Sequence, residues 1–238
     1  MRARALRIFS CVLLLTTAAR TQEVTLSARV KLVDGRKNSK VPLAENIVVW
    51  LTPSSGQLAP RVALNPHLRL TQRNKSFEPH LLIVPVGAVV EFPNRDPFFH
   101  NVFSLYEGKR FDLGLYEAGT TRNVSFDRPG ISYIFCNIHA EMSAVVIALD
   151  TPYYGVSNRN GEIVIPRVPT GSYIMRTWAE TASPKSLEAL THAVKVSDSS
   201  STLGVFEIKG STVSIAHKNK FDMDYEPPVP NSPGYDRP

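Results

Sequence analysis

The sequence contains little cysteine. Only two cysteines occur in 238 residues, and Cys11 lies in an N-terminal stretch that we expect to be removed. The mature chain would then keep Cys136 alone, which excludes an internal disulfide. The remaining thiol is buried and inert, reactive, or a metal ligand, and its neighbours favour the last of these.

The sequence also has no apolar run that suits a membrane span. The apolar stretch 8–15 is too short to cross a bilayer. It follows three arginines and precedes Thr17 and Ala19, which sit at the −3 and −1 positions of a cleavage site. This order is typical of a secretory signal peptide, so we expect residues 1–20 to be removed and the mature protein to be exported, most simply to the periplasm.

A strong excess of one charge is missing as well. The whole chain carries a formal net charge of +6, but residues 1–20 contribute four arginines and no acid. The mature chain therefore has 23 basic residues (27 minus 4) against 21 acidic ones, a net charge of +2. Such a balance gives no reason to expect a nucleic-acid partner, and we expect no membrane span in the mature chain.

No stretch has a good helical pattern of apolar residues. Eighteen prolines and thirteen glycines separate short runs that are rich in Val, Ile, Thr and Tyr. We therefore predict an all-β protein, an antiparallel β-sandwich, with a loop and one helical turn within 183–190. The expected strands are 24–32, 46–51, 68–71, 81–84, 89–92, 102–105, 121–126, 131–135, 144–149, 154–156, 162–165, 173–178, 192–196 and 203–208.

Four potential metal ligands come close together in the predicted sandwich. Cys136, His139 and Met142 form the pattern C-x2-H-x2-M between two strands, and His100 lies 36 residues upstream of Cys136. One thiolate, two imidazoles and a thioether are the donor set of a type 1 copper site. The short loop can curl three ligands around one ion, and the turn at 93–97 delivers His100 from a separate strand.

Other kinds of functional site fit these four residues less well than a type 1 copper site. Structural zinc usually has four strong ligands, and a methionine argues against it. A multicopper oxidase or copper nitrite reductase needs further histidines in H-x-H pairs, which the remaining histidines, His67, His80, His192 and His217, do not form. A cysteine nucleophile beside His139 is conceivable, but it leaves Met142 without a role.

The stretch 60–149 resembles the cupredoxins, the blue copper proteins typified by plastocyanin, pseudoazurin and amicyanin. The resemblance implies a Greek-key β-sandwich with one type 1 copper bound by His100, Cys136, His139 and Met142. It also implies that Asn101 ties the His100 strand to the Cys136 loop by hydrogen bonds. The residues that carry it are Phe77-Glu78-Pro79, Val86-Gly87, Phe92-Pro93-Asn94-Arg95-Asp96, His100-Asn101, Pro129-Gly130 with Tyr133, and Cys136-Asn137-Ile138-His139-Ala140-Glu141-Met142.

One residue of the ligand loop departs from the cupredoxin pattern. Glu141 stands where an uncharged residue such as proline is expected inside a short ligand loop. An anion beside the metal favours Cu(II) over Cu(I). We therefore expect a lower reduction potential than that of a typical relative.

The flanking stretches carry a second resemblance. Residues 160–163 and 165–173 resemble the D-G-x-F-x-[IL]-x-x-[VL]-P-x-G-x-Y motif of carboxypeptidase-regulatory-like, transthyretin-like sandwiches, and residues 24–52 look like the first two strands of that fold. This implies a small second β-sandwich with the cupredoxin inserted between its second and third strands. Trp50 and Trp178 are expected in its core.

The expected segments follow from these resemblances. Residues 1–20 are the signal peptide, 23–55 the first strands of the regulatory-like sandwich, and 60–149 the cupredoxin domain. Residues 150–210 complete the regulatory-like sandwich, and the Pro-rich tail 218–238 is expected to be disordered.

The function expected from the resemblance is one-electron transfer rather than catalysis. The whole mature chain is similar to bacterial exported proteins labelled methylamine utilisation or plastocyanin-like proteins. This implies a redox partner such as a c-type cytochrome or a periplasmic dehydrogenase, with His139 as the exit for the electron. Two alternatives stay open: a copper-binding or copper-delivery protein, and a cell-envelope binding module whose copper site is vestigial.

Overall fold

The computed structural model describes residues 22–34, 44–54, 67–105, 108–210 and 217–225. The expected signal peptide and the end of the Pro-rich tail, 226–238, lie outside these ranges. The described chain is almost entirely β, as the sequence predicted, with one short helix, α1 (Pro184–Glu188). Within these ranges, no helix combines the length and the apolar character needed to cross a membrane.

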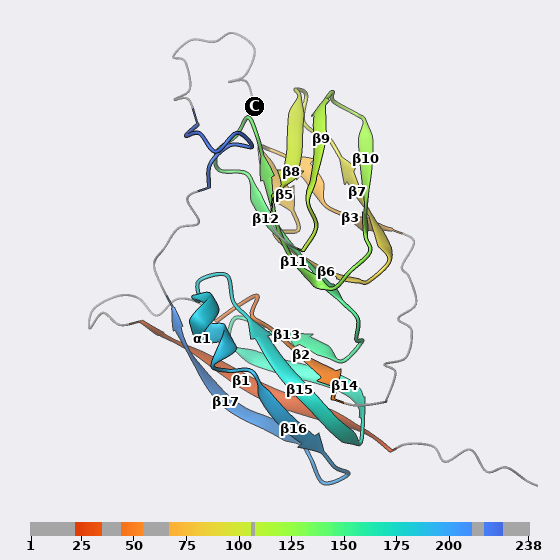
Figure 1. The fold of residues 1–238 in the computed structure, drawn as a ribbon, viewed down its shortest axis with the longest axis vertical. Coiled ribbons are helices and arrows are strands. Elements are labelled where there is room, and N and C mark those ends of the chain that lie inside the picture. Colours follow the sequence, from red (N-terminus) through yellow and green to blue (C-terminus); the bar gives the residue numbers. More distant parts are fainter. Residues whose placement is uncertain (1–21, 35–43, 55–66, 106–107, 211–216, 226–238) are drawn as a thin grey trace, which may run out of the picture.

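Two β units are stacked end to end in Figure 1. The lower one, called the flanking unit here, is built from the segments 23–53 and 154–210. Its sheets have the strand orders β14-β1-β17 and β13-β2-β15-β16. Its strands are β1 (Glu23–Asp34), β2 (Val48–Pro53), β13 (Tyr154–Val156), β14 (Glu162–Pro169), β15 (Gly171–Trp178), β16 (His192–Val196) and β17 (Thr202–Gly210).

The upper unit, called the middle unit, is formed by the chain between β2 and β13 (Figure 1). A three-stranded sheet, β10-β7-β3, faces a five-stranded sheet, β6-β12-β11-β8-β9, and β4 and β5 form a hairpin. The strands are β3 (Leu68–Arg69), β4 (Thr71–Arg73), β5 (Ser76–Glu78), β6 (Leu81–Pro85), β7 (Ala88–Pro93), β8 (His100–Ser104), β9 (Phe111–Tyr116), β10 (Thr121–Phe126), β11 (Gly130–Cys136) and β12 (Ser143–Leu149).

The core of the middle unit follows from the period of two along its strands. In β7, Ala88, Val90 and Phe92 are buried between the sheets, whereas Val89 points outward and is half exposed. Each fully buried large apolar side chain of this kind contributes about 1.5–3 kcal/mol to stability. Cys136 and Met142 belong to the same buried cluster, so the two sulfur atoms of the expected site lie at the edge of an apolar core.

A separate apolar cluster joins the two units. β12 turns Ala144, Val146 and Ala148 into the middle core and Val145, Ile147 and Leu149 toward the flanking unit. The flanking unit meets them with Val48, Trp50 and Trp178. The continuous apolar run of β2 is thereby explained, because both faces of that strand are covered.

The prediction that the two tryptophans lie in the core of the flanking unit was therefore wrong. Val49 and Leu51 fill that core, whereas Val48 and Trp50 point to the opposite face of β2. The indole of Trp178 donates a hydrogen bond to the hydroxyl of Tyr133 in the middle unit, at 3.3 Å.

Three further expectations need correction. Three sheets are mixed rather than antiparallel, since β1–β17, β6–β12 and β3–β7 pair in parallel, whereas the sheet β13-β2-β15-β16 is antiparallel as expected. The sequence analysis missed β9, an edge strand whose alternation is weak and which contains Gly114 at a positive φ of 67°. The tail was expected to be disordered from residue 218, yet residues 217–225 hydrogen-bond to the middle unit.

An ion pair also links the two units. His80 follows the β4–β5 hairpin, and its Nε2 lies 2.8 Å from the Glu180 carboxylate of the flanking unit, while its Nδ1 lies 3.1 Å from the carbonyl oxygen of Ser143. Both ring nitrogens therefore face acceptors, and only the imidazolium can donate from both. The hydrogen bond to Glu180 raises the pKa of His80 above its usual 6.5.

We expect this pair to be visible in the titration of His80. Since the pKa in the folded protein is raised, the pair stabilises the fold below pH 6.5, and the contribution is lost as the pH rises through the folded pKa. The pair is partly exposed, so it contributes about 1 kcal/mol or less. NMR titration should give His80 a pKa above 6.5 that falls in Glu180→Gln; equal values in both proteins would contradict the ion pair.

Candidate metal centre

The loop between β11 and β12 presents three of the four candidate ligands. Cys136 is the last residue of β11, and Met142 directly precedes β12. The loop closes on itself, because the N–H of Cys136 donates to the Met142 carbonyl at 3.2 Å and the N–H of Met142 donates to the His139 carbonyl at 3.1 Å. This compact turn holds the side chains of Cys136 and His139 on the same side.

The fourth candidate, His100, comes from a neighbouring strand. It is the first residue of β8, which pairs antiparallel with the end of β11 so that Val102 lies opposite Cys136. Its Nδ1 lies 3.6 Å from Sγ of Cys136, and Nδ1 of His139 lies 3.5 Å from the same sulfur. The ligand atoms of His100, Cys136 and His139 all lie within 4.8 Å of one another.

Met142, the remaining candidate, lies in the apolar core. Its side chain is fully buried and packs in the same apolar cluster as Cys136. His100 and Cys136 are also fully buried, whereas His139 reaches the surface with 9% of its area exposed. The cluster is therefore almost completely buried, and His139 is its least buried member.

Burial determines the protonation of the cluster. Burial lowers the pKa of His100, although the hydrogen bond to Asp96 acts in the opposite direction. Burial also lowers the pKa of His139 to about 4, with smaller contributions from the positive charges of protonated His100 and of Lys75. Both rings are neutral at pH 7, which is the form that binds metals. Burial raises the pKa of Cys136, and the backbone N–H groups of Asn101, Ile138 and His139 counter that rise. A bound cation would complete the deprotonation of this thiol.

A buried carboxylate orients His100. Asp96 Oδ2 lies 2.8 Å from His100 Nε2, on the side of the ring away from Cys136. The carboxylate also accepts hydrogen bonds from the backbone N–H groups of Asn74 (2.5 Å) and Lys75 (3.0 Å), and the Asp96 N–H donates to Asn94 Oδ1. Because Nε2–H donates to Asp96, the lone pair of Nδ1 is left to face the cluster.

An aromatic ring borders the two imidazoles. The ring of Phe98 lies 5.3 Å from that of His100 and 5.5 Å from that of His139, measured between centroids. The next residue, Phe99, is 43% exposed. The sequence left open whether Phe98 and Phe99 belong to the core or to a surface patch. In the structure Phe98 is half-buried and Phe99 is exposed.

Asn101 joins the two ligand-bearing segments through its main chain. The N–H of Asn137 donates to the Asn101 carbonyl at 2.8 Å, and the N–H of Asn101 points to the Cys136 thiol. The Asn101 side chain turns the other way and donates to Asp112 on β9 at 2.6 Å. The tie implied by the resemblance is therefore present, but the backbone makes it.

Two contributors were missed by the sequence analysis. Asp96 stands four residues before His100, between Asn94 and Pro97, and an acidic residue that close to a candidate ligand is the signal that could have identified it. Tyr225, whose hydroxyl donates to the Cys136 carbonyl, lies 89 residues away in the chain. No local pattern marks such a contact.

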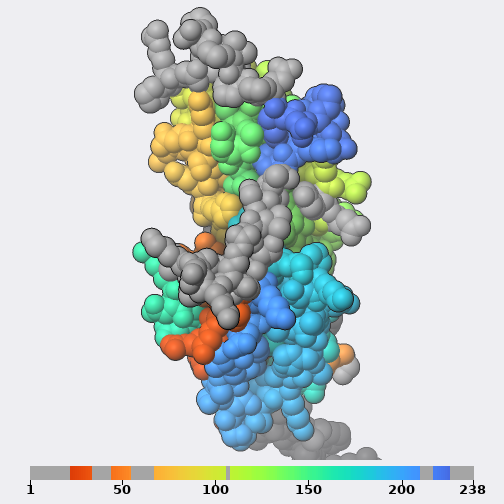
Figure 2. Space-filling view, turned by 90° about the vertical axis from the view of Figure 1, so that its left-hand side faces the viewer, coloured from red at the N-terminus to blue at the C-terminus, as the bar shows by residue number. Residues whose placement is uncertain are grey.

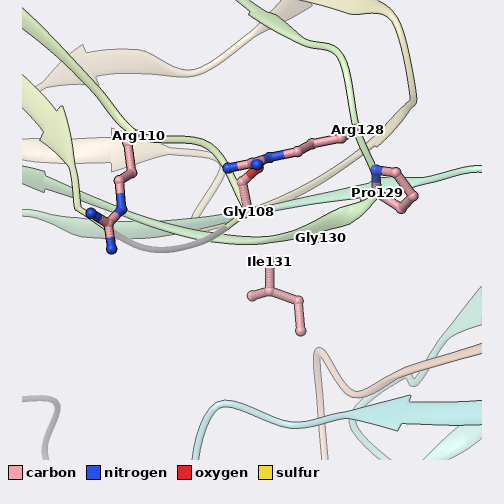
Figure 3. Close-up of a pocket in the computed structure, with 6 residues that line it drawn as sticks. All are labelled: Gly108, Arg110, Arg128, Pro129, Gly130 and Ile131. Carbon is pink, nitrogen blue, oxygen red and sulfur yellow. The ribbon is translucent and has the colours of Figure 1, made fainter.

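A second hollow of the middle unit lies far from the ligands. An open cavity of about 660 Å³ is lined by Gly108, Arg110 and the start of β11, whereas Cys136 is at the other end of that strand. In Figure 3 the Arg128 side chain extends over Gly108, to whose carbonyl its Nε donates, and Ile131 points away from both arginines. The charged groups here are exposed arginines, which makes this cavity a weaker candidate for a functional site than the buried cluster.

Comparisons with known proteins give only distant likenesses. No protein-family model and no curated protein matches the sequence. A solved Cu-containing nitrite reductase from Thermus scotoductus SA-01 is 24% identical, with a TM-score of 0.34, over 41% of this chain and 25% of that one.

Two smaller solved proteins are matched over nearly their whole length. A purple cupredoxin from Nitrosopumilus maritimus is 21% identical over 34% of this chain and 99% of its own, with a TM-score of 0.31. A reduced amicyanin variant is 20% identical over 42% and 99%, with a TM-score of 0.33. At such low scores, the side chains of the cluster have to carry the functional conclusion.

We expect Asp96→Asn to weaken metal binding by this cluster. The substitution removes the carboxylate that orients His100, and loss of such a partner typically weakens metal affinity about 10–100-fold. Competition titration against a chelator measures the effect. Asp127→Asn is the matched control, because Asp127 is an exposed residue of the same unit that pairs with Lys109. Equal affinities in the two variants would contradict a positioning role for Asp96.

Proposed function

We propose that this protein binds one copper ion as a type 1 centre and transfers single electrons. The observation that supports the proposal most is the convergence of two imidazoles and one thiol within 4.8 Å in a buried pocket. The donor set matches the near-trigonal plane of a blue copper site, with the buried thioether of Met142 as the weak axial ligand. Copper bound there would supply one-electron cycling between Cu(II) and Cu(I).

The residues of this chain have separate tasks in the proposed site. His100 and His139 offer Nδ1, and Cys136 offers Sγ. Asp96 and the backbone of Asn74 fix His100 from behind, while the closed loop fixes Cys136 and Met142. A framework that holds the ligands in place keeps the geometry similar in both oxidation states, which favours fast electron transfer.

Electron exit through His139 is the most direct route from the cluster. His139 is its least buried member, with 9% of its area exposed, and Phe98 packs against its ring. An electron leaving through this imidazole crosses little protein before it reaches a partner. We propose a redox protein such as a c-type cytochrome or a periplasmic dehydrogenase as that partner, and the periplasm as the compartment, in keeping with the expected signal peptide.

The flanking unit fits a role in structure or binding. Its two sheets and the insertion of the middle unit between β2 and β13 support the proposal of a transthyretin-like, regulatory-like sandwich. The potential ligands that cluster in the described residues belong to the middle unit. We therefore propose that the flanking unit carries or places the copper site without taking part in its chemistry.

Addition of Cu(II) to the purified mature protein tests the proposal. An intense thiolate-to-copper charge-transfer band should appear at one copper per chain and be absent in Cys136→Ser, since serine cannot supply the thiolate. A colourless wild-type protein would refute the copper assignment. Rapid electron exchange with a c-type cytochrome supports electron transfer, whereas handover of copper to a chelating partner supports the alternative of copper delivery.

The charge of Glu141 should be measurable in the reduction potential. Glu141 is exposed and acts on His139 by its charge, so it lies close to the proposed copper. Its anion favours Cu(II), and Glu141→Gln should raise the potential by roughly 20–40 mV, the equivalent of about 0.5–1 kcal/mol for one electron. Voltammetry at low salt measures it. An unchanged or lower potential would show that Glu141 has no such effect.

A further inference from the structure

The segment 217–225 lies on the middle unit although it follows the last strand of the flanking unit. Figure 1 shows it beside β12, and Figure 2 shows its blue atoms packed against green residues of the middle unit. Besides Asp112 on β9, it contacts Phe135, Cys136 and Asn137, three consecutive residues at the end of β11 and the start of the ligand loop.

The first contact is made by Tyr225. Its hydroxyl donates to the Cys136 carbonyl at 2.7 Å, and its oxygen lies 3.1 Å from His217 Nδ1. A carbonyl can only accept, so the phenol hydrogen goes to Cys136 and the hydroxyl oxygen is left to accept from His217 Nδ1–H. Burial and the nearby Cys136 raise the pKa of Tyr225, which keeps the phenol a donor at neutral pH.

The second contact is made by Lys220. Its backbone N–H donates to Asn137 Oδ1 at 2.9 Å, and its Nζ lies 2.7 Å from Asp112 Oδ2. The other oxygen of Asp112 accepts from the Asn101 side chain. Lys220 is thus connected directly to Asn137, which follows Cys136, and through Asp112 to Asn101, which follows His100.

The third contact is made by His217. Its ring stacks on Phe135, with 4.0 Å between centroids and 23° between planes. The segment is also braced internally, because Asn219 Oδ1 accepts from the N–H groups of Phe221 and Met223. The three contacts therefore come from a short, locally ordered turn.

We propose that residues 217–225 form a clamp that positions the ligand loop, with Tyr225 as the positioning residue for Cys136. The clamp holds the peptide carbonyl of Cys136 and the side chain of Asn137 from outside the pocket, and so restricts the direction in which the thiol points. Because the clamp follows β17, it also connects the flanking unit to the ligand loop. The effect on copper rests on the proposed function; the effect on the loop does not.

The test compares Tyr225→Phe with Tyr173→Phe. Tyr173 is a matched control, since its hydroxyl donates to the Pro169 carbonyl at 2.8 Å within the flanking unit, far from the ligands. In the metal-depleted protein, amide hydrogen exchange at Cys136, Asn137 and Met142 should be about tenfold faster in Tyr225→Phe and unchanged in Tyr173→Phe. A factor of ten is about 1.4 kcal/mol, close to the net value of one hydrogen bond.

The copper-loaded proteins give a second readout. In Tyr225→Phe the charge-transfer band should shift and copper should pass to a chelator about tenfold faster, with no change in Tyr173→Phe. If Tyr225→Phe does not fold, Lys220→Ala replaces it, because it removes the ion pair with Asp112 and keeps the backbone hydrogen bond. Lys218→Ala is then the control, since Lys218 pairs with the exposed Asp222.

The outcomes separate the clamp from the copper assignment. Equal exchange rates in the clamp variant and its control would overturn the clamp, whether or not copper binds. A wild-type protein that binds no copper would refute the proposed function, while the exchange rates would still decide the clamp. Faster exchange with an unshifted band would show that the segment holds the loop but not the thiolate, which would overturn the positioning role of Tyr225.

Discussion

The antiparallel register of β8 on β11 is the constraint on which the site depends. Val102 lies opposite Cys136, and an extension of this register by two residues would place His100 opposite Ile138, the residue before His139. Two ligands that are 36 residues apart in the chain thus meet because one strand ends where the other begins. A shift of one residue would turn the side chains of β8 to the opposite face and remove His100 from the pocket.

Burial then gives the pocket its chemistry. Burial keeps the two imidazoles and the thiol neutral. Burying polar groups costs free energy unless they have hydrogen-bond partners. Asp96 supplies a partner for His100, and backbone N–H groups supply partners for the Cys136 sulfur. In the proposed copper site, the binding of the cation and the loss of the thiol proton are coupled.

Much of this could be predicted from the sequence, where local patterns carry the information. Alternation along strands such as 121–126 marked the β units, and the C-x2-H-x2-M pattern marked the ligand loop. The contacts between distant segments could not be predicted in the same way. Trp178 was expected in the core of the flanking unit, and only its packing against β12 shows that it lies in the cluster between the two units. Tyr225 lies in a Pro-rich tail whose composition indicates disorder, and its hydrogen bond to Cys136 depends on the folded position of both units.

In the proposed site, one thiolate and two imidazoles bind the same copper ion, with a thioether as a distant fourth ligand. X-ray absorption at the copper edge of the loaded protein measures these ligands directly. We expect one short copper–sulfur distance, two copper–nitrogen distances typical of imidazole, and no second short copper–sulfur distance, and we expect the short copper–sulfur distance to be absent in Cys136→Ser. A first shell made only of nitrogen and oxygen in the wild-type protein would contradict it.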